Sequence, residues 1–276
     1  MSQGKPLPAS PKLDLVGERI NTHRERFRLR VFERDSAAVL AEVRSQQDAG
    51  VTHLDINAGG SPAKEADDLL WILDTILPEL KPETGLLIDS MSAECLARAL
   101  FRIHDRPKTL INAITNDADK LAAILPLVQQ HRTGVVAICG SVSSSPRTSE
   151  ERLAAAEQLH RALSSAGVAD ERIYFDPLLL PLAYDPQQPR AVLETVRELT
   201  RRWPNAHTIV GLSNVSFNMP NRSLLNRAYL AMLLAAGANA FILNPVDAEL
   251  VGIVTAARAL LGQDDFLTDY LAHATE

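Results

Sequence analysis

The stretch Thr208-Ile209-Val210-Gly211-Leu212-Ser213-Asn214-Val215-Ser216 carries the pattern that decides the fold. An apolar, β-branched run ends in a polar Ser-Asn pair, and a helix-like segment follows from Ser223. Leu87-Ile88-Asp89-Ser90 and Tyr174-Phe175-Asp176-Pro177 end in the same way. Short runs that are apolar on both faces are typical of strands in a parallel sheet, and polar residues at the carboxyl ends of such strands are how a barrel presents a site.

Strand-like and helix-like segments alternate along the chain. Strands are expected near residues 13–17, 53–57, 86–89, 109–113, 135–139, 173–176, 208–212 and 240–243. Helices are expected at 37–49, 63–77, 93–101, 118–130, 149–166, 191–202, 223–236 and 248–260. About eight such units predict an α/β fold, a single-domain (β/α)8 TIM barrel over residues 13–276, preceded by a flexible leader at residues 1–12. A doubly wound open sheet is the alternative, but Gly17-Glu18-Arg19-Ile20 is not the glycine-rich turn it usually carries.

Composition narrows the class of protein. The chain has 276 residues and is 46% hydrophobic, enough for one barrel, and its formal net charge of -6 disfavours a nucleic-acid partner. The basic cluster at residues 24–34 is interpreted as a solvated loop and helix start. Only Cys95 and Cys139 are cysteines, no signal-peptide pattern is present, and no run of about 18 apolar residues exists. We therefore expect a cytoplasmic protein without a membrane segment.

The residues at the expected strand ends are mostly Asn and Asp, with no His. They are Glu18, Asn21, Asp55, Asn57, Asp89, Asn112, Asp176, Asn214 and Asn244. This set lacks a nucleophilic triad and a His-rich metal cluster, so no metal site is expected. An ionised Asp accepts two parallel donors, and Asn both donates and accepts. The pattern therefore suits recognition of the hydrogen-bonding edge of a neutral heterocycle, such as the 2-amino-4-oxo pyrimidine edge of a pterin.

Each residue also has a purely structural interpretation. Asp89 could cap the helix that begins near Ala93, and Asp176 before Pro177 could open a turn. Asn112 or Asn214 could merely hold a loop. The functional interpretation is favoured because all four are expected at the same end of a barrel.

Seven motifs occur in order and together resemble a known family. They are Gly17-Glu18-Arg19-Ile20-Asn21, Leu54-Asp55-Ile56-Asn57, Ile88-Asp89-Ser90, Ile111-Asn112, Asp176-Pro177-Leu178, Gly211-Leu212-Ser213-Asn214-Val215-Ser216 and Asn221-Arg222-Ser223-Leu224-Leu225-Asn226-Arg227. The chain resembles the pterin-binding methyltransferases, especially methyltetrahydrofolate:corrinoid/iron–sulfur protein methyltransferase, and more distantly the folate domain of cobalamin-dependent methionine synthase. The resemblance runs from about Leu15 to Leu261.

The resemblance implies a homodimeric TIM barrel that binds methyltetrahydrofolate at its C-terminal mouth. It implies the following site residues: Asp89, Asn112 and Asp176 as pterin readers, Asn214 as the hydrogen-bond partner of the methyl-bearing N5, Gly211 and Ser213 as substrate-binding neighbours, and Arg222 near the outer part of the folate. Glu18 and Asn21 match the motif without an assigned role. Phe217 stands where the acetogenic enzyme has a Gln, and it could stack on the substrate or pack against protein. The loop at residues 139–145 also departs from the family pattern.

The implied chemistry is methyl transfer between N5 and the cobalt of a corrinoid, in either direction. A hydrogen bond that strengthens at N5 in the transition state would make the amine a better leaving group, and an amide side chain can follow that change. No D-x-H-x-x-G corrinoid motif and no zinc-thiolate cluster occur, so the corrinoid is expected on a partner protein. One alternative is a dihydropteroate synthase, although Gly59-Gly60-Ser61-Pro62-Ala63 lacks its basic loop. Another alternative is a non-catalytic subunit that binds a pterin or docks a corrinoid protein.

Overall fold

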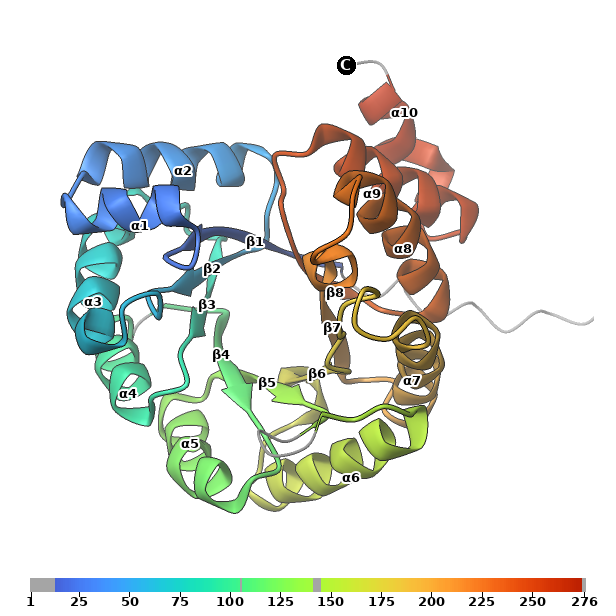
Figure 1. Cartoon of the computed structure of the whole chain (residues 1–276), viewed down its shortest axis with the longest axis horizontal. Coiled ribbons are helices and arrows are strands. Elements are labelled where there is room, and N and C mark those ends of the chain that lie inside the picture. The colour runs from blue at the N-terminus through green and yellow to red at the C-terminus, as the bar shows by residue number, and fades with distance from the viewer. Residues whose placement is uncertain (1–12, 105, 141–144, 275–276) are drawn as a thin grey trace, which may run out of the picture.

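The computed structural model describes residues 13–104, 106–140 and 145–274, so the expected leader and residues 141–144 of the loop lie outside the described residues. Eight parallel strands form a closed barrel in chain order, in which β1 also pairs with β8 (Figure 1). The strands are β1 Asp14–Asn21, β2 His53–Asn57, β3 Gly85–Asp89, β4 Thr109–Ile114, β5 Gly134–Ile138, β6 Ile173–Asp176, β7 His207–Gly211 and β8 Ala240–Leu243. The predicted TIM barrel is confirmed.

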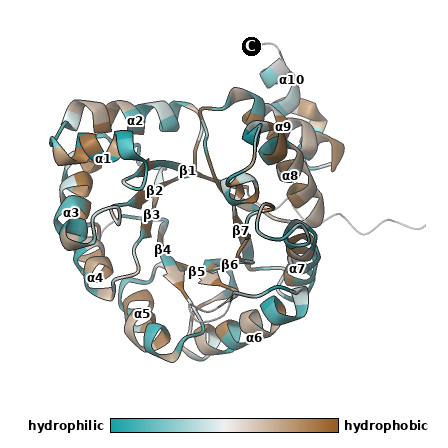
Figure 2. Ribbon diagram, in the orientation of Figure 1, coloured by the Kyte–Doolittle hydropathy of each residue, from teal (hydrophilic) through white to brown (hydrophobic). Residues whose placement is uncertain are grey.

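Helices surround the barrel in a ring (Figure 1). They are α1 Glu25–Phe32, α2 Ser36–Asp48, α3 Glu65–Ile76, α4 Ala93–Arg102, α5 Ala118–His131, α6 Ser149–Ser165, α7 Gln188–Arg202, α8 Arg222–Ala236 and α9 Ala248–Leu260, with α10 Thr268–Ala274 outside the ring. Polar and apolar residues alternate along the outer helices, as expected when one face packs on the strands (Figure 2). Local signals define the ends: Thr148 and Glu151 form a capping box that begins α6, and Gly237, at a φ of 104°, ends α8.

The period of two along each strand separates two sets of side chains. One set faces the helices, and includes Leu54 and Ile56 of β2. The other set faces the barrel interior, where its middle layer is apolar: Val16, Leu87, Leu110, Ala113, Val136, Tyr174, Ile209 and Ala240 pack together. These residues come from seven strands and can meet only inside the barrel. The apolar layer therefore separates two polar ends of one interior.

Three local features differ from the expected boundaries. Glu18 and Asn21 lie within β1, which continues to Asn21 after an irregularity between Gly17 and Ile20. The basic cluster forms the complete helix α1, because Phe27 and Val31 give it a buried face. The short helices α10 and η4 (Leu212–Ser216) were also not expected.

Candidate active site at the carboxyl ends of the strands

The carboxyl ends of β2, β3 and β4 place three polar side chains in one row. Asn57 pairs with Asp89, and Asp89 with Asn112, in the parallel register. The Asn57 amide donates to Asp89 Oδ2 at 2.7 Å, and Asn57 Oδ1 accepts from the Gly59 backbone at 3.0 Å. Asp89 does not cap α4, because Ser92 accepts the Cys95 N–H at 3.2 Å. The row is therefore a wall of hydrogen-bonding groups held by neighbouring strands.

Asp55 is the most deeply buried carboxylate of this end, with 3% of its surface exposed. Its Oδ1 has no hydrogen-bond partner among the described residues. Burial raises the pKa of Asp55 well above its usual range, and the nearby Asp89 and Glu18 carboxylates raise it further. Burial also raises the pKa of Asp89, although the Asn57 amide opposes that shift. Buried acids with so few hydrogen-bond partners from the protein are typical of a site in which a bound ligand supplies the missing partners.

Asp176 ends β6 and lies on the other side of β5 from Asn112. Its Oδ1 accepts the Leu178 N–H at 2.8 Å, so the Asp-Pro turn that the sequence suggested is present. Burial raises the pKa of Asp176 to about 6, against the lowering effects of the Leu178 N–H and Arg152. The turn occupies one carboxylate oxygen and holds the group at the barrel end.

Arg152 of α6 fixes the loop that follows Asp176, although its side chain is fully buried. Its Nε donates to the Pro177 carbonyl at 2.6 Å and its Nη2 to the Leu178 carbonyl at 3.3 Å and to Gln188 Oε1 at 2.5 Å. Its Nη1 donates to the Thr148 carbonyl at 3.1 Å. The planar guanidinium thus ties α6, the loop and α7 together. Arg152 was not predicted as a site residue; its only signal in the sequence is an Arg at a position on the apolar face of α6.

The turn after β7 carries Ser213 and Asn214 on the short helix η4. Ser213 Oγ donates to Glu18 Oε2 at 3.1 Å, and this links β7 to β1 across β8. Arg222, at the start of α8, donates from Nη2 to the Ser213 carbonyl at 2.9 Å and from Nε to Ser216 Oγ at 3.0 Å. Burial raises the pKa of Glu18, and the Ser213 hydroxyl opposes that shift. Arg222 therefore anchors the turn that presents Asn214.

Asn214 itself is exposed. A small cavity of about 200 Å³ at this end is lined by Glu18, Ser213 and Arg222, but not by Asn214. A Cβ at Gly211 would stand 3.1 Å from Asn214 Nδ2, so glycine leaves room for the amide. Phe217 is 53% exposed and does not line this cavity.

The barrel therefore brings the predicted residues to one end, on four strands, the short helix η4 and the start of α8: Asp89, Asn112, Asp176, Gly211, Ser213, Asn214 and Arg222. Phe217 follows η4 at that end, and its side chain is exposed. Asp55 belongs to the same end. The sequence indicates it as a candidate because it is an acidic residue between the apolar residues Leu54 and Ile56 of one strand.

Two further properties bear on the chemistry. No group of three or more His, Cys, Asp or Glu side chains within the described ranges could hold a metal ion. None of the helices among these residues is long and apolar enough to cross a membrane.

Comparison with known proteins gives consistent matches. Residues 17–244 match the family described as pterin binding enzyme. The chain is 27% identical over 261 residues to the methylcorrinoid:tetrahydrofolate methyltransferase of Eubacterium limosum, covering 93% of this chain and 94% of that protein. It is also 27% identical over 257 residues to the methionine synthase of Mycobacterium leprae, covering 87% of this chain but 21% of that much longer protein.

Solved structures support the fold. The dihydropteroate synthase of Coxiella burnetii in complex with pteroic acid superposes with a TM-score of 0.67 at 20% identity, covering 91% of this chain and 94% of that one. The family match covers most of the chain, including every strand except the first residues of β1. The chain belongs to the family of pterin-binding enzymes.

Proposed function

We propose that this protein is a methyltransferase that moves a methyl group between N5 of methyltetrahydrofolate and the cobalt of a corrinoid protein. The observation that carries the proposal is the set of Asp89, Asn112 and Asp176 at one barrel end, with Asn214 exposed on an anchored turn at the same end. The similarity to the Eubacterium limosum methyltransferase over 93% of the chain supports the same reaction.

The acidic end fits a pterin in its hydrogen-bonding chemistry. A pterin edge offers an N–H and an exocyclic amine side by side, and a carboxylate accepts two such donors. Asp89 and Asp176 supply carboxylates, and Asn112 supplies an amide that both donates and accepts. Asp55, with an unpaired buried oxygen beside them, is a further acceptor for the ligand or for a bound water.

Asn214 is the proposed catalytic residue. When the methyl group leaves, the N5–C bond breaks, its electron pair stays on N5, and N5 takes up a proton from solvent. The electron pair of the partner's Co(I) would form the new bond to carbon and give methyl-Co(III). The Asn214 amide forms a hydrogen bond to N5. This hydrogen bond becomes stronger as negative charge develops on N5 in the transition state, which lowers the barrier. Arg222 and Ser213 hold the turn in place, so little reorganisation is needed during the reaction.

The corrinoid would come from a separate corrinoid protein that docks over this barrel end. Phe217 and Asn214 are exposed there, which leaves the turn accessible to such a partner. We further propose that the barrel begins at residue 13, that the protein is a cytoplasmic homodimer, and that residues 1–12 are a leader.

A mixture of the protein, methyltetrahydrofolate and a Co(I) corrinoid protein tests the reaction. We expect the absorption spectrum of Co(I) to be replaced by that of methyl-Co(III), and the reverse with tetrahydrofolate and the methylated corrinoid protein. No spectral change with several corrinoid proteins would reject the transferase.

Dihydropteroate synthase is the second candidate, because structures of that enzyme share the fold. The loop Gly59-Gly60-Ser61-Pro62-Ala63 has no basic side chain for pyrophosphate, which disfavours it. A pteroate-formation assay decides between the two. Calorimetry with methyltetrahydrofolate, run beside the spectral assay, separates an enzyme from a subunit that only binds.

A further inference from the structure

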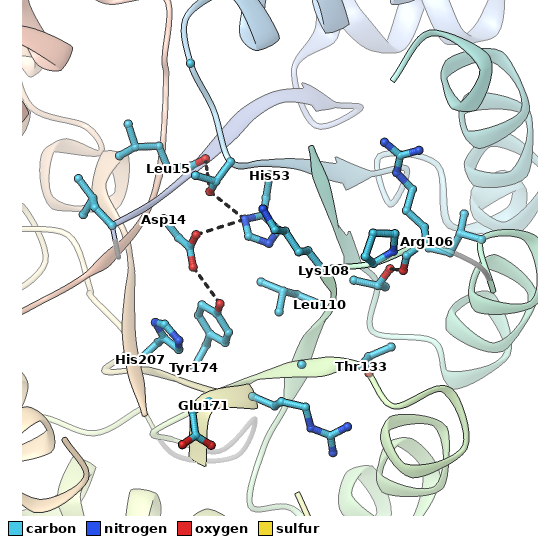
Figure 3. Close-up of a pocket in the computed structure, with 18 of the residues that line it drawn as sticks. Asp14, Leu15, His53, Arg106, Lys108, Leu110, Thr133, Glu171, Tyr174 and His207 are labelled. Atoms are coloured by element: carbon cyan, nitrogen blue, oxygen red, sulfur yellow. Dashed lines mark hydrogen bonds and ion pairs between the residues drawn. The ribbon is translucent and has the colours of Figure 1, made fainter. Parts of the chain in front are cut away.

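A cavity of about 880 Å³ lies at the end of the barrel opposite to the candidate active site, where the strands begin (Figure 3). Its wall comes from the starts of six strands, β1, β2, β4, β5, β6 and β7, and from the ends of α4 and α5 and one face of α9. Small-molecule sites typically occupy about 300–1,000 Å³. Exposed lining residues such as Lys108 and Arg132 show that the cavity opens to solvent.

Four side chains form the inner wall. The Tyr174 hydroxyl donates to Asp14 Oδ2 at 2.8 Å, and His53 Nδ1 lies 3.8 Å from Asp14 Oδ1 (Figure 3). The rings of Tyr174 and His207 stack with their centroids 4.2 Å apart and 9° between their planes. Burial lowers the pKa of both His53 and His207, which favours their neutral forms, and His53 Nδ1 also lies 2.9 Å from Thr52 Oγ1. The inner wall is therefore polar and aromatic.

Three buried polar atoms of this wall have no hydrogen-bond partner within the part of the chain that the structure describes. They are His207 Nδ1, Thr133 Oγ1 and Arg106 Nε. Burying such a group without a partner costs about 1–3 kcal/mol. If these side chains only packed the end of the barrel, apolar side chains at the same positions would make the folded protein more stable. These atoms have almost no accessible surface, so a ligand reaches them only when the side chains rotate toward the cavity; their unmet hydrogen-bonding capacity favours a polar ligand over an apolar one.

Glycines at the starts of two strands keep the inner wall in place. A Cβ at Gly85 would collide with the His53 ring, and a Cβ at Gly134 would collide with Leu110. Both glycines have negative φ, so no turn requires them. Their role at this end is to leave space for side chains of the cavity wall.

The cavity has the opposite charge balance from the whole chain, whose formal net charge is -6. Its cationic lining residues are Arg106, Lys108, Arg132, Arg172 and Arg258, against the carboxylates of Asp14, Glu171 and Asp269. Arg258 already pairs with Asp269 at 3.0 Å. Neither Arg132 nor Arg172 has an acidic partner within ion-pair distance among the residues described. A ligand with a negative group would neutralise them.

We propose that this cavity is a second ligand site, which binds a small flat heterocycle carrying a phosphate or carboxylate. The ring lies against Tyr174 and His207 and satisfies the unpaired Thr133 and His207 groups. The anionic group lies at the rim between Arg132 and Arg172. The site is separated from the candidate active site by the apolar layer of the barrel interior.

Isothermal titration calorimetry of the full chain tests the proposal with four probes. Adenosine 5′-monophosphate carries a ring and a phosphate, and orotate carries a ring and a carboxylate. Adenosine and inorganic phosphate each carry one half of the expected chemistry. We expect at least one ring-plus-anion probe to bind with one-to-one stoichiometry and at least tenfold more tightly than either half. Whichever of adenosine 5′-monophosphate and orotate binds more tightly indicates whether the site prefers a phosphate or a carboxylate.

Three variants locate the site. The double variant Arg132→Glu/Arg172→Glu should weaken the best probe at least tenfold, whereas Arg197→Glu, on the exposed face of α7, should leave its affinity unchanged. Thr133→Val removes a buried hydroxyl that has no partner within the described chain, so we expect about fivefold weaker binding with an unchanged or higher Tm. Loss of binding without loss of stability is a result that a merely structural role of Thr133 would not give.

Three outcomes would overturn the proposal: no probe binding below 5 mM, binding that ignores the Arg132→Glu/Arg172→Glu change, or displacement of the probe by methyltetrahydrofolate. The last would place the probe at the candidate active site. These measurements need no methyl transfer, so they succeed or fail independently of the proposed reaction.

Discussion

The two ends of the barrel interior are built on the same rows of side chains, yet they differ in chemistry. Along β1, inward-facing positions run from Asp14 through Val16 to Glu18. Along β6, they run from Tyr174 to Asp176. The carboxyl end gathers carboxylates and amides, whereas the amino end combines histidines, a tyrosine and arginines.

The ends differ also in how their loops are held. At the carboxyl end, the buried Arg152 holds the loop after β6, and Arg222 holds the turn after β7 through its hydrogen bond to the Ser213 carbonyl. At the amino end, Arg132 and Arg172 have no acidic partner within the described ranges. The comparison suggests that the carboxyl end is organised before its substrate arrives, whereas the amino end has charge to neutralise. Organisation of this kind favours catalysis, because donors need not reorient during the reaction.

The largest effect is expected from Asn214→Ala. Removing one hydrogen-bond donor that acts mainly in the transition state typically costs about 100-fold to 1,000-fold in rate. We expect a loss of this size in methyl transfer, measured by stopped-flow absorption of the corrinoid, with methyltetrahydrofolate affinity changed less than tenfold. Asn205→Ala, in an exposed loop at the other end of β7, serves as the control. Full activity of Asn214→Ala would rule out its proposed role.

Arg152→Met tests whether the carboxyl-end loop depends on its buried anchor. The change removes four hydrogen bonds and leaves the Pro177, Leu178 and Thr148 carbonyls without that donor. We expect the free energy of unfolding to fall by about 3 kcal/mol, measured by urea denaturation. Arg161→Met on the exposed face of α6 should change it by less than about 0.5 kcal/mol. A similar loss in both variants would show that the loop anchor has no special importance.

Asp176 gives a pH test. Its pKa is about 6 in the folded chain and 3.8 as an unperturbed group, so folding favours the protonated form. The energetic cost of the buried charge is absent below about pH 4, grows between about pH 4 and 6, and is complete above that. As pH rises through this window, the free energy of unfolding of Asp176→Asn should become about 2–3 kcal/mol larger than that of the wild type.

The same group should govern binding in the opposite direction. Below about pH 6 the protonated Asp176 loses acceptor capacity, so methyltetrahydrofolate affinity should fall as pH decreases through that value. Calorimetry at pH 5 and pH 8 measures this change. An equal pH dependence in Asp176→Asn would assign the effect to another group.

The smallest effect is expected at the amino end, from Tyr174→Phe. The variant loses one hydrogen bond to Asp14 and keeps the aromatic stack on His207. We expect a loss of about 1 kcal/mol in the free energy of unfolding, clearly less than for Arg152→Met. Thermal denaturation checks the order of the two, and a reversed order would mean that the amino end is the better anchored one.

Much of this arrangement could be predicted from the sequence. The eight strands begin and end within two residues of their expected positions, apart from β1, because each is a short apolar run bounded by polar residues. The same period placed Asp89, Asn112 and Asp176 at one end, since successive parallel strands all point the same way. Asp55 was visible as an acid within an apolar strand, but its missing partner was not.

The sequence by itself determined the barrel, its direction and the chemistry of the residues at its carboxyl end, because these depend on local periodicity and on residue type. The tertiary structure decided what depends on contacts between distant segments. Arg152 meets the loop at Pro177 only after α6 packs beside α7. Asp14 meets Tyr174 only when the barrel closes, across 160 residues of chain. The cavity at the amino end arises from such closure, and no local pattern could have announced it.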